Sequence, residues 1–529
     1  MKAYALFRQA GAQFCRRRSN FKSAWDKMNK PEAILICAAV VFFGYAGPAR
    51  AQTHFRNLKS GLNPSFSTYS GMGEPLPSMN SNAGDLRNFI NGQQNMKEIE
   101  TLNSAKNPTG PAGQLGPLFN NTSCAACHSN PTVGGGGLNL FEQRLSTGGP
   151  PVRIFAVDNM LMQGPMMQLD NLIFPNGVAA ATLGGEIGLQ NDQASACQQV
   201  EEARGFSYKL PICIPGTAND TGTTGAPTCI AHRESLPIYG DGLVEATADE
   251  TFEQIAAGQD KAIRGSIRMI VETNQNGPFA SEVSSKTLSA FSVPHVGRFG
   301  WKDQHSSLLA FAGDAYLNEI GVTSDLDKNP DTTCAMGVTQ FGVPLQVADD
   351  PEDTVDSSGR SDIDRFTDFM RGLQPPPRAP QNTGTQAGQK LFEQINCSGC
   401  HVESITTASD PAAFLPPTIN GQPLTTTMNS ALANVTYHPY SDFLMHDMGS
   451  LGDGVNDSAS PGDVGGPTMM RTMPLWGIRA REFFLHDGRA SDIPTAIILH
   501  DGQGKAAAQA FQNLSPAQQQ QIVDFIETL

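Results

Sequence analysis

The sequence predicts a mainly α-helical protein whose helices are joined by long loops. Apolar residues recur at helical spacing in four segments, 248–271, 306–320, 362–373 and 386–395. A last helix is predicted to begin at Ser515-Pro516, since serine is a preferred N-cap and proline is favoured at the first helical position. Stretches rich in Gly, Pro, Asn, Ser and Thr separate these segments and predict loops.

Residues 1–51 have the features of a signal peptide. Basic residues including Arg16, Arg17 and Arg18 precede an apolar run at 33–45, and Ala49-Arg50-Ala51 follows as a small-x-small cleavage pattern. The apolar run is short for a membrane span, although an uncleaved anchor is the alternative. We therefore expect an exported protein, periplasmic or secreted, with no membrane span after cleavage.

Composition shifts divide the remaining chain. An extended N-terminal arm is expected over 52–110 and a first domain over 111–374, with an insertion at about 190–235. Three consecutive prolines open a linker at 375–385, because proline cannot continue a helix. A second domain is expected over 386–529.

Cysteine usage agrees with export. Of the ten cysteines, two leave with the signal peptide and four belong to two C-x-x-C-H motifs. The remaining four are an even number in an exported chain, which predicts two disulfides that brace the insertion. Their pairing is open: Cys197, Cys213, Cys229 and Cys334.

The two C-x-x-C-H motifs predict two covalently attached haems c. Two thiols on one short turn can form two thioether bonds, and the next histidine then becomes the proximal iron ligand. A thioredoxin-like redox pair would require a βαβ setting, and a zinc site would require further ligands at short spacing, and both are missing. The predicted haem-binding residues are Cys124, Cys127 and His128 in the first motif and Cys397, Cys400 and His401 in the second. Both predicted domains are therefore expected to resemble cytochrome c.

The sixth ligand decides whether each haem only carries electrons or also performs chemistry. No histidine lies between His128 and His232, so a nearby sixth ligand of the first haem is not a histidine. Four methionines at 160–167 could supply a sulfur, although such clusters are more often packing residues.

Five ordered motifs carry a resemblance to a known family. They are Gly116-Pro117-Leu118-Phe119-Asn120, Gly297 to Lys302, Tyr440 to Gly449, Leu475-Trp476-Gly477, and Leu485 to Ala490. Together they resemble the bacterial di-haem oxidoreductase family of peroxidases and "thiol oxidoreductases". That family is related to the di-haem cytochrome c peroxidases and the MauG-type enzymes.

The resemblance implies three functional positions. Relatives place a methionine ligand of the second haem fourteen residues after the motif that His486 opens, and here that position is His500. The second haem is then expected to be bis-histidine, although His500 could instead cap a helix. Trp301 resembles the tryptophan between the haems, and Glu319 resembles the acid–base glutamate over the peroxidatic haem, with Glu245 in reserve.

Other charged residues are expected to contact the haems indirectly. Arg298 and Arg489 are candidates for pairing with haem propionates. His446 and His486 are expected to be supporting residues whose tautomers are fixed by the adjacent Asp447 and Asp487. Relatives bind calcium between the haems, but the sequence offers no match for its ligands.

The expected function is reduction of peroxide at the first haem, with electrons relayed from the second. The alternatives are a di-haem oxygenase acting on an organic substrate and a non-enzymatic electron-transfer cytochrome. A net charge of −15 argues against nucleic acid as a partner. It suits a small redox donor protein, a cytochrome or cupredoxin, although an acidic surface more often only aids solubility.

Overall fold

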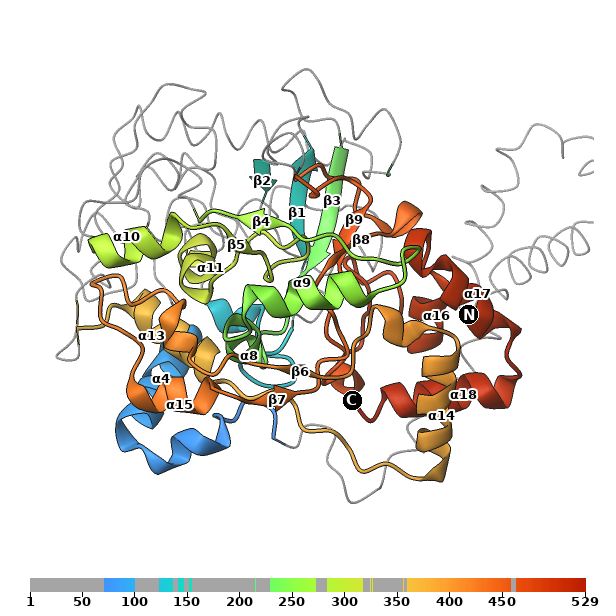
Figure 1. The fold of residues 1–529 in the computed structure, drawn as a ribbon, viewed down its shortest axis with the longest axis horizontal. Coiled ribbons are helices and arrows are strands. Elements are labelled where there is room, and N and C mark those ends of the chain that lie inside the picture. Colours follow the sequence, from blue (N-terminus) through green and yellow to red (C-terminus); the bar gives the residue numbers. More distant parts are fainter. Residues whose placement is uncertain are drawn as a thin grey trace, which may run out of the picture. The chain divides into compact units, whose positions relative to one another are not determined.

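A computed structural model covers the chain, and its described residues lie in the unit that runs from Ser65 to Leu529 (Figure 1). The structure describes 71–99, 123–136, 141–146, 152–154, 229–272, 283–316, 359–457 and 463–529, and single positions at 215, 324, 326 and 355. The predicted signal peptide, most of the insertion and the methionines at 160–167 lie outside these residues. In the part of the chain that is described, no helix is long and apolar enough to cross a membrane.

Helices dominate the described chain, as the sequence predicts. The α-helices are α4 (Ala83–Lys97), α8 (Asp241–Glu245), α9 (Asp249–Gly258), α10 (Ser285–Phe291), α11 (Leu308–Ala315), α13 (Asp362–Gly372), α14 (Thr383–Gln394), α15 (Thr426–Leu432), α16 (Ile493–Ile498), α17 (Lys505–Asn513) and α18 (Pro516–Ile526). Short 3-10 turns are η2 (Pro77–Ser81), η3 (Cys124–Ala126), η9 (Cys397–Gly399), η10 (Pro411–Ala413), η11 (Gly449–Leu451), η12 (Ile478–Ala480) and η13 (Gly502–Gly504).

The strands are short and antiparallel. They are β1 (Phe141–Ser146), β2 (Val152–Ile154), β3 (Cys229–Glu234), β4 (Met269–Ile270), β5 (His295–Val296), β6 (Ile405–Thr406), β7 (Thr436–Tyr437), β8 (Met445–Asp447) and β9 (Met469–Arg471). One sheet has the order β2-β1-β3, and the other strands form the pairs β4-β5, β6-β7 and β8-β9. These pieces of sheet mainly fix the ends of loops.

Local capping explains where the predicted helices begin. The Ser515 side chain accepts a hydrogen bond from Gln518 N and caps α18, with Pro516 in the first turn, as predicted. Ser361 caps α13 in the same way, and Asn382 caps α14. The segment 248–271 is helical only as far as Gly258; beyond it the chain forms turns and strand β4.

Two pairs of helices pack closely at a glycine. Helix α4 lies against α13, and α14 lies against α18 (Figure 1). A Cβ at Gly92 would collide with the carbonyl of Arg365, and a Cβ at Gly388 would collide with that of Gln521. Glycine at these crossings therefore lets the backbones approach.

The prediction of an extended arm over 52–110 is wrong for part of that range. Residues 83–97 form helix α4, whose apolar side includes the buried Phe89 and Met96. Asn82 caps this helix by accepting hydrogen bonds from Gly84 N and Asp85 N. The polar composition concealed a helix because most of its residues face away from α13.

The largest core cluster joins residues from both predicted domains. It contains Leu243 and Phe369 from the first and Leu432 and Phe443 from the second. A smaller cluster, which includes Phe392, Ile493 and Phe525, belongs to the predicted second domain alone. The boundary at 375–385 stays a prediction, and residues 405–444 pack largely with the first part of the chain.

Candidate functional site

The first C-x-x-C-H motif forms a tight turn set in loops. Cys124 begins the 3-10 turn η3, and the His128 amide donates to the Cys124 carbonyl at 3.0 Å. His128 Nδ1 lies 2.8 Å from the carbonyl oxygen of Leu236, a residue far along the chain. Because a carbonyl only accepts, this bond places the ring proton on Nδ1 and leaves Nε2 as the ligand atom.

The second motif repeats this geometry in a helical frame. The His401 amide donates to the Cys397 carbonyl at 2.9 Å, and His401 Nδ1 lies 2.8 Å from the Tyr440 carbonyl. The His401 ring also packs near Phe392, with the ring centroids 6.2 Å apart. Desolvation lowers the pKa of His401 to about 4, which keeps the imidazole neutral, the form that binds metals.

His500 has the same arrangement at the end of α16. Its Nδ1 lies 2.8 Å from the Ala496 carbonyl, and desolvation lowers its pKa. Charge on His500 also lowers the pKa of His401, because the two rings lie near each other. A helix-capping role would use the ring in a similar bond, so His500 as a ligand of the second haem stays a prediction.

These three histidines fit a haem-binding role. In each, a backbone carbonyl fixes the tautomer that leaves Nε2 available to iron. In each, desolvation lowers the pKa and favours the neutral ring. The chain can therefore hold two haems through His128, His401 and the four cysteines of the two turns, with His500 beside His401.

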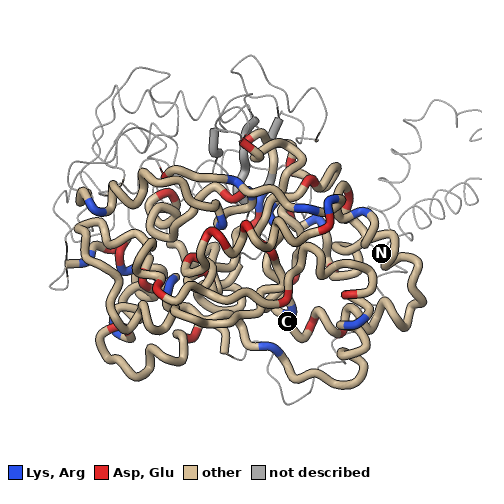
Figure 2. The backbone as a smooth tube through the Cα atoms, viewed as in Figure 1, with Lys and Arg blue, Asp and Glu red and all other residues tan. Residues whose placement is uncertain are grey.

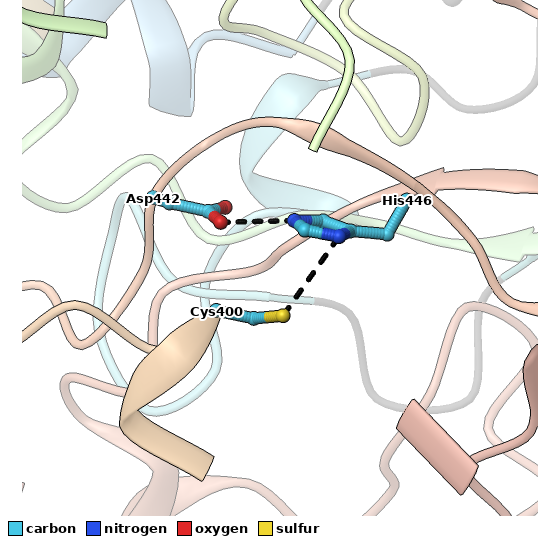
Figure 3. Close-up of side chains that lie close together, drawn as sticks. All are labelled: Cys400, Asp442 and His446. Atoms are coloured by element: carbon cyan, nitrogen blue, oxygen red, sulfur yellow. Dashed lines mark hydrogen bonds and ion pairs between the residues drawn. The ribbon is translucent and has the colours of Figure 1, made fainter. Parts of the chain in front are cut away.

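A further histidine, His446, is buried against the second motif. His446 Nδ1 is 3.8 Å from Cys400 Sγ, and its Nε2 is 2.9 Å from Asp442 Oδ2 (Figure 3). Gln259 Nε2 donates both to Asp442 Oδ2 at 2.6 Å and to the Gly399 carbonyl at 2.9 Å. These atoms hold the Cys397–Cys400 turn against the segment that follows α9.

The predicted partner of His446 was wrong. The adjacent Asp447 is exposed and accepts from Gly449 N, whereas Asp442 is fully buried and pairs with the ring. The reason is the strand β8, in which successive side chains point to opposite faces. Cys400, Asp442 and His446 also satisfy the spacing of a metal cluster, but Cys400 is part of the predicted haem attachment.

Trp301 is buried and bonds to the segment that contacts the first motif, and its position between the haems stays a prediction. Its indole Nε1 donates to the Glu234 carbonyl at 2.9 Å, two residues before the Leu236 that accepts from His128. Its side chain packs with Leu236 and Met470. Its ring also meets the buried His486 edge to face, with the ring centroids 6.3 Å apart.

The two glutamates expected near the first haem have different outcomes. Glu319 lies outside the described residues, so its acid–base role stays a prediction. Glu245 is buried in α8, where both carboxylate oxygens pair with Arg371 at 2.7 and 3.1 Å. Its Oε1 also accepts from Leu308 N at 2.8 Å, at the start of α11. These bonds show that Glu245 joins α8 to α11 and to Arg371 in α13.

The arginines expected to meet propionates have protein partners. Arg298 is buried and donates to the carbonyls of Val296 and Thr247 and to the carboxylate of Asp249. Arg489 lies at the surface, where its Nε is 2.6 Å from Asp487 Oδ2. His486 Nε2 is 3.9 Å from the same carboxylate oxygen. Propionate contacts of both arginines stay predictions.

A buried ion network that the sequence did not reveal lies next to Trp301. The Lys302 ammonium is fully buried and lies 2.6 Å from Asp453 Oδ1 and 2.9 Å from the Gly466 carbonyl. Arg233 pairs with the same Asp453 and with Asp457, at 2.5 and 2.8 Å. Acidic and basic positions are interspersed through the described chain (Figure 2), and although Lys302 ends one of the five motifs, no motif contains Arg233, Asp453 or Asp457.

Comparison with known proteins defines the class of this chain as an oxidoreductase. The model of the family described as "Di-haem oxidoreductase, putative peroxidase" matches residues 226–529. The chain therefore belongs to the di-haem oxidoreductase family. The matched residues contain Trp301, the second motif and His500, and they begin after the first motif.

Other comparisons add little. No curated protein matches the chain. Among solved structures, hydrazine synthase of Kuenenia stuttgartiensis is similar at 18% identity and a TM-score of 0.20. That match covers 32% of this chain and 55% of the other, so it spans about half of the hydrazine synthase chain. A similarity at this level carries no argument about function.

Proposed function

We propose that this protein is an exported di-haem c-type cytochrome that reduces peroxide at its first haem with electrons relayed from its second. When bound, the haems supply the redox chemistry, and the chain supplies ligands, positions and the path between them. The single observation that carries the proposal is the shared geometry of His128, His401 and His500. Each ring is anchored through Nδ1 to a carbonyl 2.8 Å away.

The pairing of histidines makes the two sites unequal. His500 lies close enough to His401 to lower its pKa, which supports two histidine ligands on the second haem. Two filled axial positions favour electron storage over substrate binding. For the first haem, His128 is the proposed ligand, and an open or displaceable position opposite it would admit peroxide.

The surroundings of Trp301 support a relay between the sites. Its indole bonds to the strand end that leads to Leu236, the carbonyl partner of His128. Its backbone carbonyl accepts from the Arg471 amide at 2.9 Å, in the strand pair β8-β9 that carries His446. The residue is therefore held by its indole and by its backbone carbonyl, each bonded to a segment that contacts one of the motifs.

Three further parts of the proposal rest on sequence. The predicted signal peptide and the haem motifs support a periplasmic or secreted location. The acidic composition supports a small basic redox protein as electron donor. The family resemblance supports Glu319 as the group that takes a proton from peroxide and returns it to the departing oxygen.

Spectroscopy of the purified holoprotein tests the proposal. Optical and EPR spectra are recorded for the oxidised and half-reduced protein, with and without hydrogen peroxide. We expect one low-spin haem that ignores peroxide and one haem whose spectrum changes with it. Two unresponsive low-spin haems would favour the electron-transfer cytochrome. Oxygen uptake with an organic substrate, without turnover of peroxide, would favour the oxygenase.

A further inference from the structure

Met448 lies in a loop that is fastened to the loop after His500. The Asp447 amide donates to Gln503 Oε1 at 2.7 Å. On the other side of Met448, the Ser450 hydroxyl and amide donate to Asp501 Oδ2 at 2.7 and 3.2 Å. Because these bonds flank Met448 on both sides, they hold its backbone next to the loop that follows His500.

Gly504 shows how close the methionine and the histidine are. A Cβ placed on Gly504 would lie 3.2 Å from Met448 Cε and 3.1 Å from His500 Cδ2. The thioether methyl and the imidazole therefore meet around the same small space. A side chain at position 504 would press on both groups.

The other side of Met448 faces the tryptophan cluster. Met448 packs against the group formed by Leu236, Trp301 and Met470. The Met448 amide donates to the Thr468 carbonyl at 2.9 Å, at the end of the strand pair β8-β9. The same strand β9 holds the Trp301 carbonyl through the Arg471 amide.

These contacts form one continuous connection from His128, in the first motif, to His500, the proposed second ligand of the other haem. It runs from His128 to the Leu236 carbonyl, through the side chains of Leu236 and Trp301, and through Met448 to His500. We propose that Met448 is the positioning residue that joins Trp301 to the second haem and thereby sets the route of electrons between the sites. The inference rests on the proposed function, because it requires a relay through Trp301.

The proposed role of Met448 is to fill the space between Trp301 and His500 with packed atoms. One electron leaves the site of His401 and His500 and one arrives at the site of His128, with no bond made or broken and no change in the methionine itself. Electron transfer is faster through packed atoms than across a void, and a shortened side chain would leave a void here. Methionine suits this position because its long, polarizable side chain adapts to irregular gaps.

Shortening the side chain in the holoprotein tests the inference. The variants Met448→Leu, Met448→Val and Met448→Ala are compared by the rate of electron exchange between the haems after rapid partial reduction. Met448→Ala should slow this exchange by about tenfold or more, equivalent to about 1.4 kcal/mol in barrier. The exchange rate should be intermediate in Met448→Val and close to that of the parent protein in Met448→Leu. Met473→Ala is the matched control, because Met473 packs on the same cluster.

Two further measurements separate a connecting role from a structural one. The reduction potentials and the low-spin spectrum of the second haem should stay unchanged in all the Met448 variants. A changed spectrum or potential would overturn the inference, because Met448 would then act as a ligand or as a support of His500. The graded series keeps the test decisive even where Met448→Ala fails to fold.

Trp301→Phe distinguishes this inference from the proposed function. If Trp301→Phe leaves the exchange rate unchanged, the relay through Trp301 is wrong and the inference fails with it. If Trp301→Phe slows the exchange and Met448→Ala does not, the relay stands and only the role of Met448 is wrong.

Discussion

The two C-x-x-C-H turns are nearly alike, but the structures that hold them differ. Each turn is a short 3-10 helix whose histidine donates from Nδ1 to a carbonyl 2.8 Å away. Around His128 the partners are backbone groups of loops: the amide of Gly134 donates to the His128 carbonyl, and the amide of Ile238 donates to the Gly134 carbonyl. Loops therefore supply these hydrogen bonds of the first site, and the turn also rests on helix α4, where the Ser123 hydroxyl donates to the Met96 carbonyl at 3.2 Å.

Around the second turn, helices and aromatic rings are the frame. Helix α14 leads into the turn and packs on α18. Phe392 meets Phe525 and Tyr440 with ring centroids 5.4 and 6.1 Å apart. Helices and rings hold a site rigidly, whereas loops are the usual place for groups that bind and react. The contrast matches the proposed division between electron storage and peroxide chemistry.

Among the substitutions considered, removal of the His500 imidazole should change the difference between the two haem sites most. Without its imidazole, the second haem would lose its proposed sixth ligand, so His500→Ala should convert that haem from low spin to high spin. The first haem should keep its spectrum. EPR and optical spectra of the oxidised protein measure this change directly.

The control for this variant is His438→Ala. His438 is exposed and bonds only to the Ser404 hydroxyl in the described chain, at 3.1 Å. Its loss should leave both spectra intact. A low-spin second haem in His500→Ala would show that the second site has another ligand, and the two sites would then be less different than proposed.

The ion pair of Glu245 and Arg371 should give the next largest effect. Both side chains are buried, and Arg371 also donates to the Pro416 carbonyl at 3.2 Å. Glu245→Gln removes the carboxylate that pairs directly with the buried guanidinium, which should lower the free energy of unfolding by about 3–5 kcal/mol. Urea unfolding measures the loss.

Glu403→Gln is the matched control. Glu403 lies 3.6 Å from Arg378 in a pair that is partly exposed, so its loss should cost less than about 1 kcal/mol. If Glu245→Gln is as stable as the parent but peroxide turnover stops, then Glu245 is a catalytic group and the first site is not as loop-based as we describe.

Much of the helical frame could be predicted from sequence because its signals are local. The capping residue Ser515 predicts α18, and the apolar spacing of 362–373 and of the segment before Cys397 predicts α13 and α14. The cysteine spacing predicts both haem turns for the same reason. His500 could be found only through its distance in sequence from His486 and the family pattern.

What could not be predicted depends on contacts between distant segments. Leu236 meets His128 across 108 positions, and Lys302 meets Asp453 across a similar separation. No local pattern indicates such pairs. Asp442 was missed for a related reason, because the neighbouring Asp447 offered a simpler partner for His446 until the strand geometry excluded it.

Replacement of Glu234, whose carbonyl accepts from the Trp301 indole, should produce the smallest effect. Burial raises its pKa to about 7, against the lowering effect of Arg481 at 3.0 Å. Below about pH 4.5 the carboxyl is protonated in both the folded and the unfolded chain. As the pH rises towards 7, the unfolded chain releases its proton first, so the folded state loses stability by about 3 kcal/mol. Glu234→Gln should make the decline between pH 5 and pH 8 smaller by about this amount, measured as the free energy of unfolding in urea; burial also raises the pKa of Asp241 to about 7, so part of the decline remains. The exposed Glu482→Gln should keep it. An unchanged decline in Glu234→Gln would show that the decline comes from other titrating groups and that the Glu234 carboxyl beside Trp301 does not cause it.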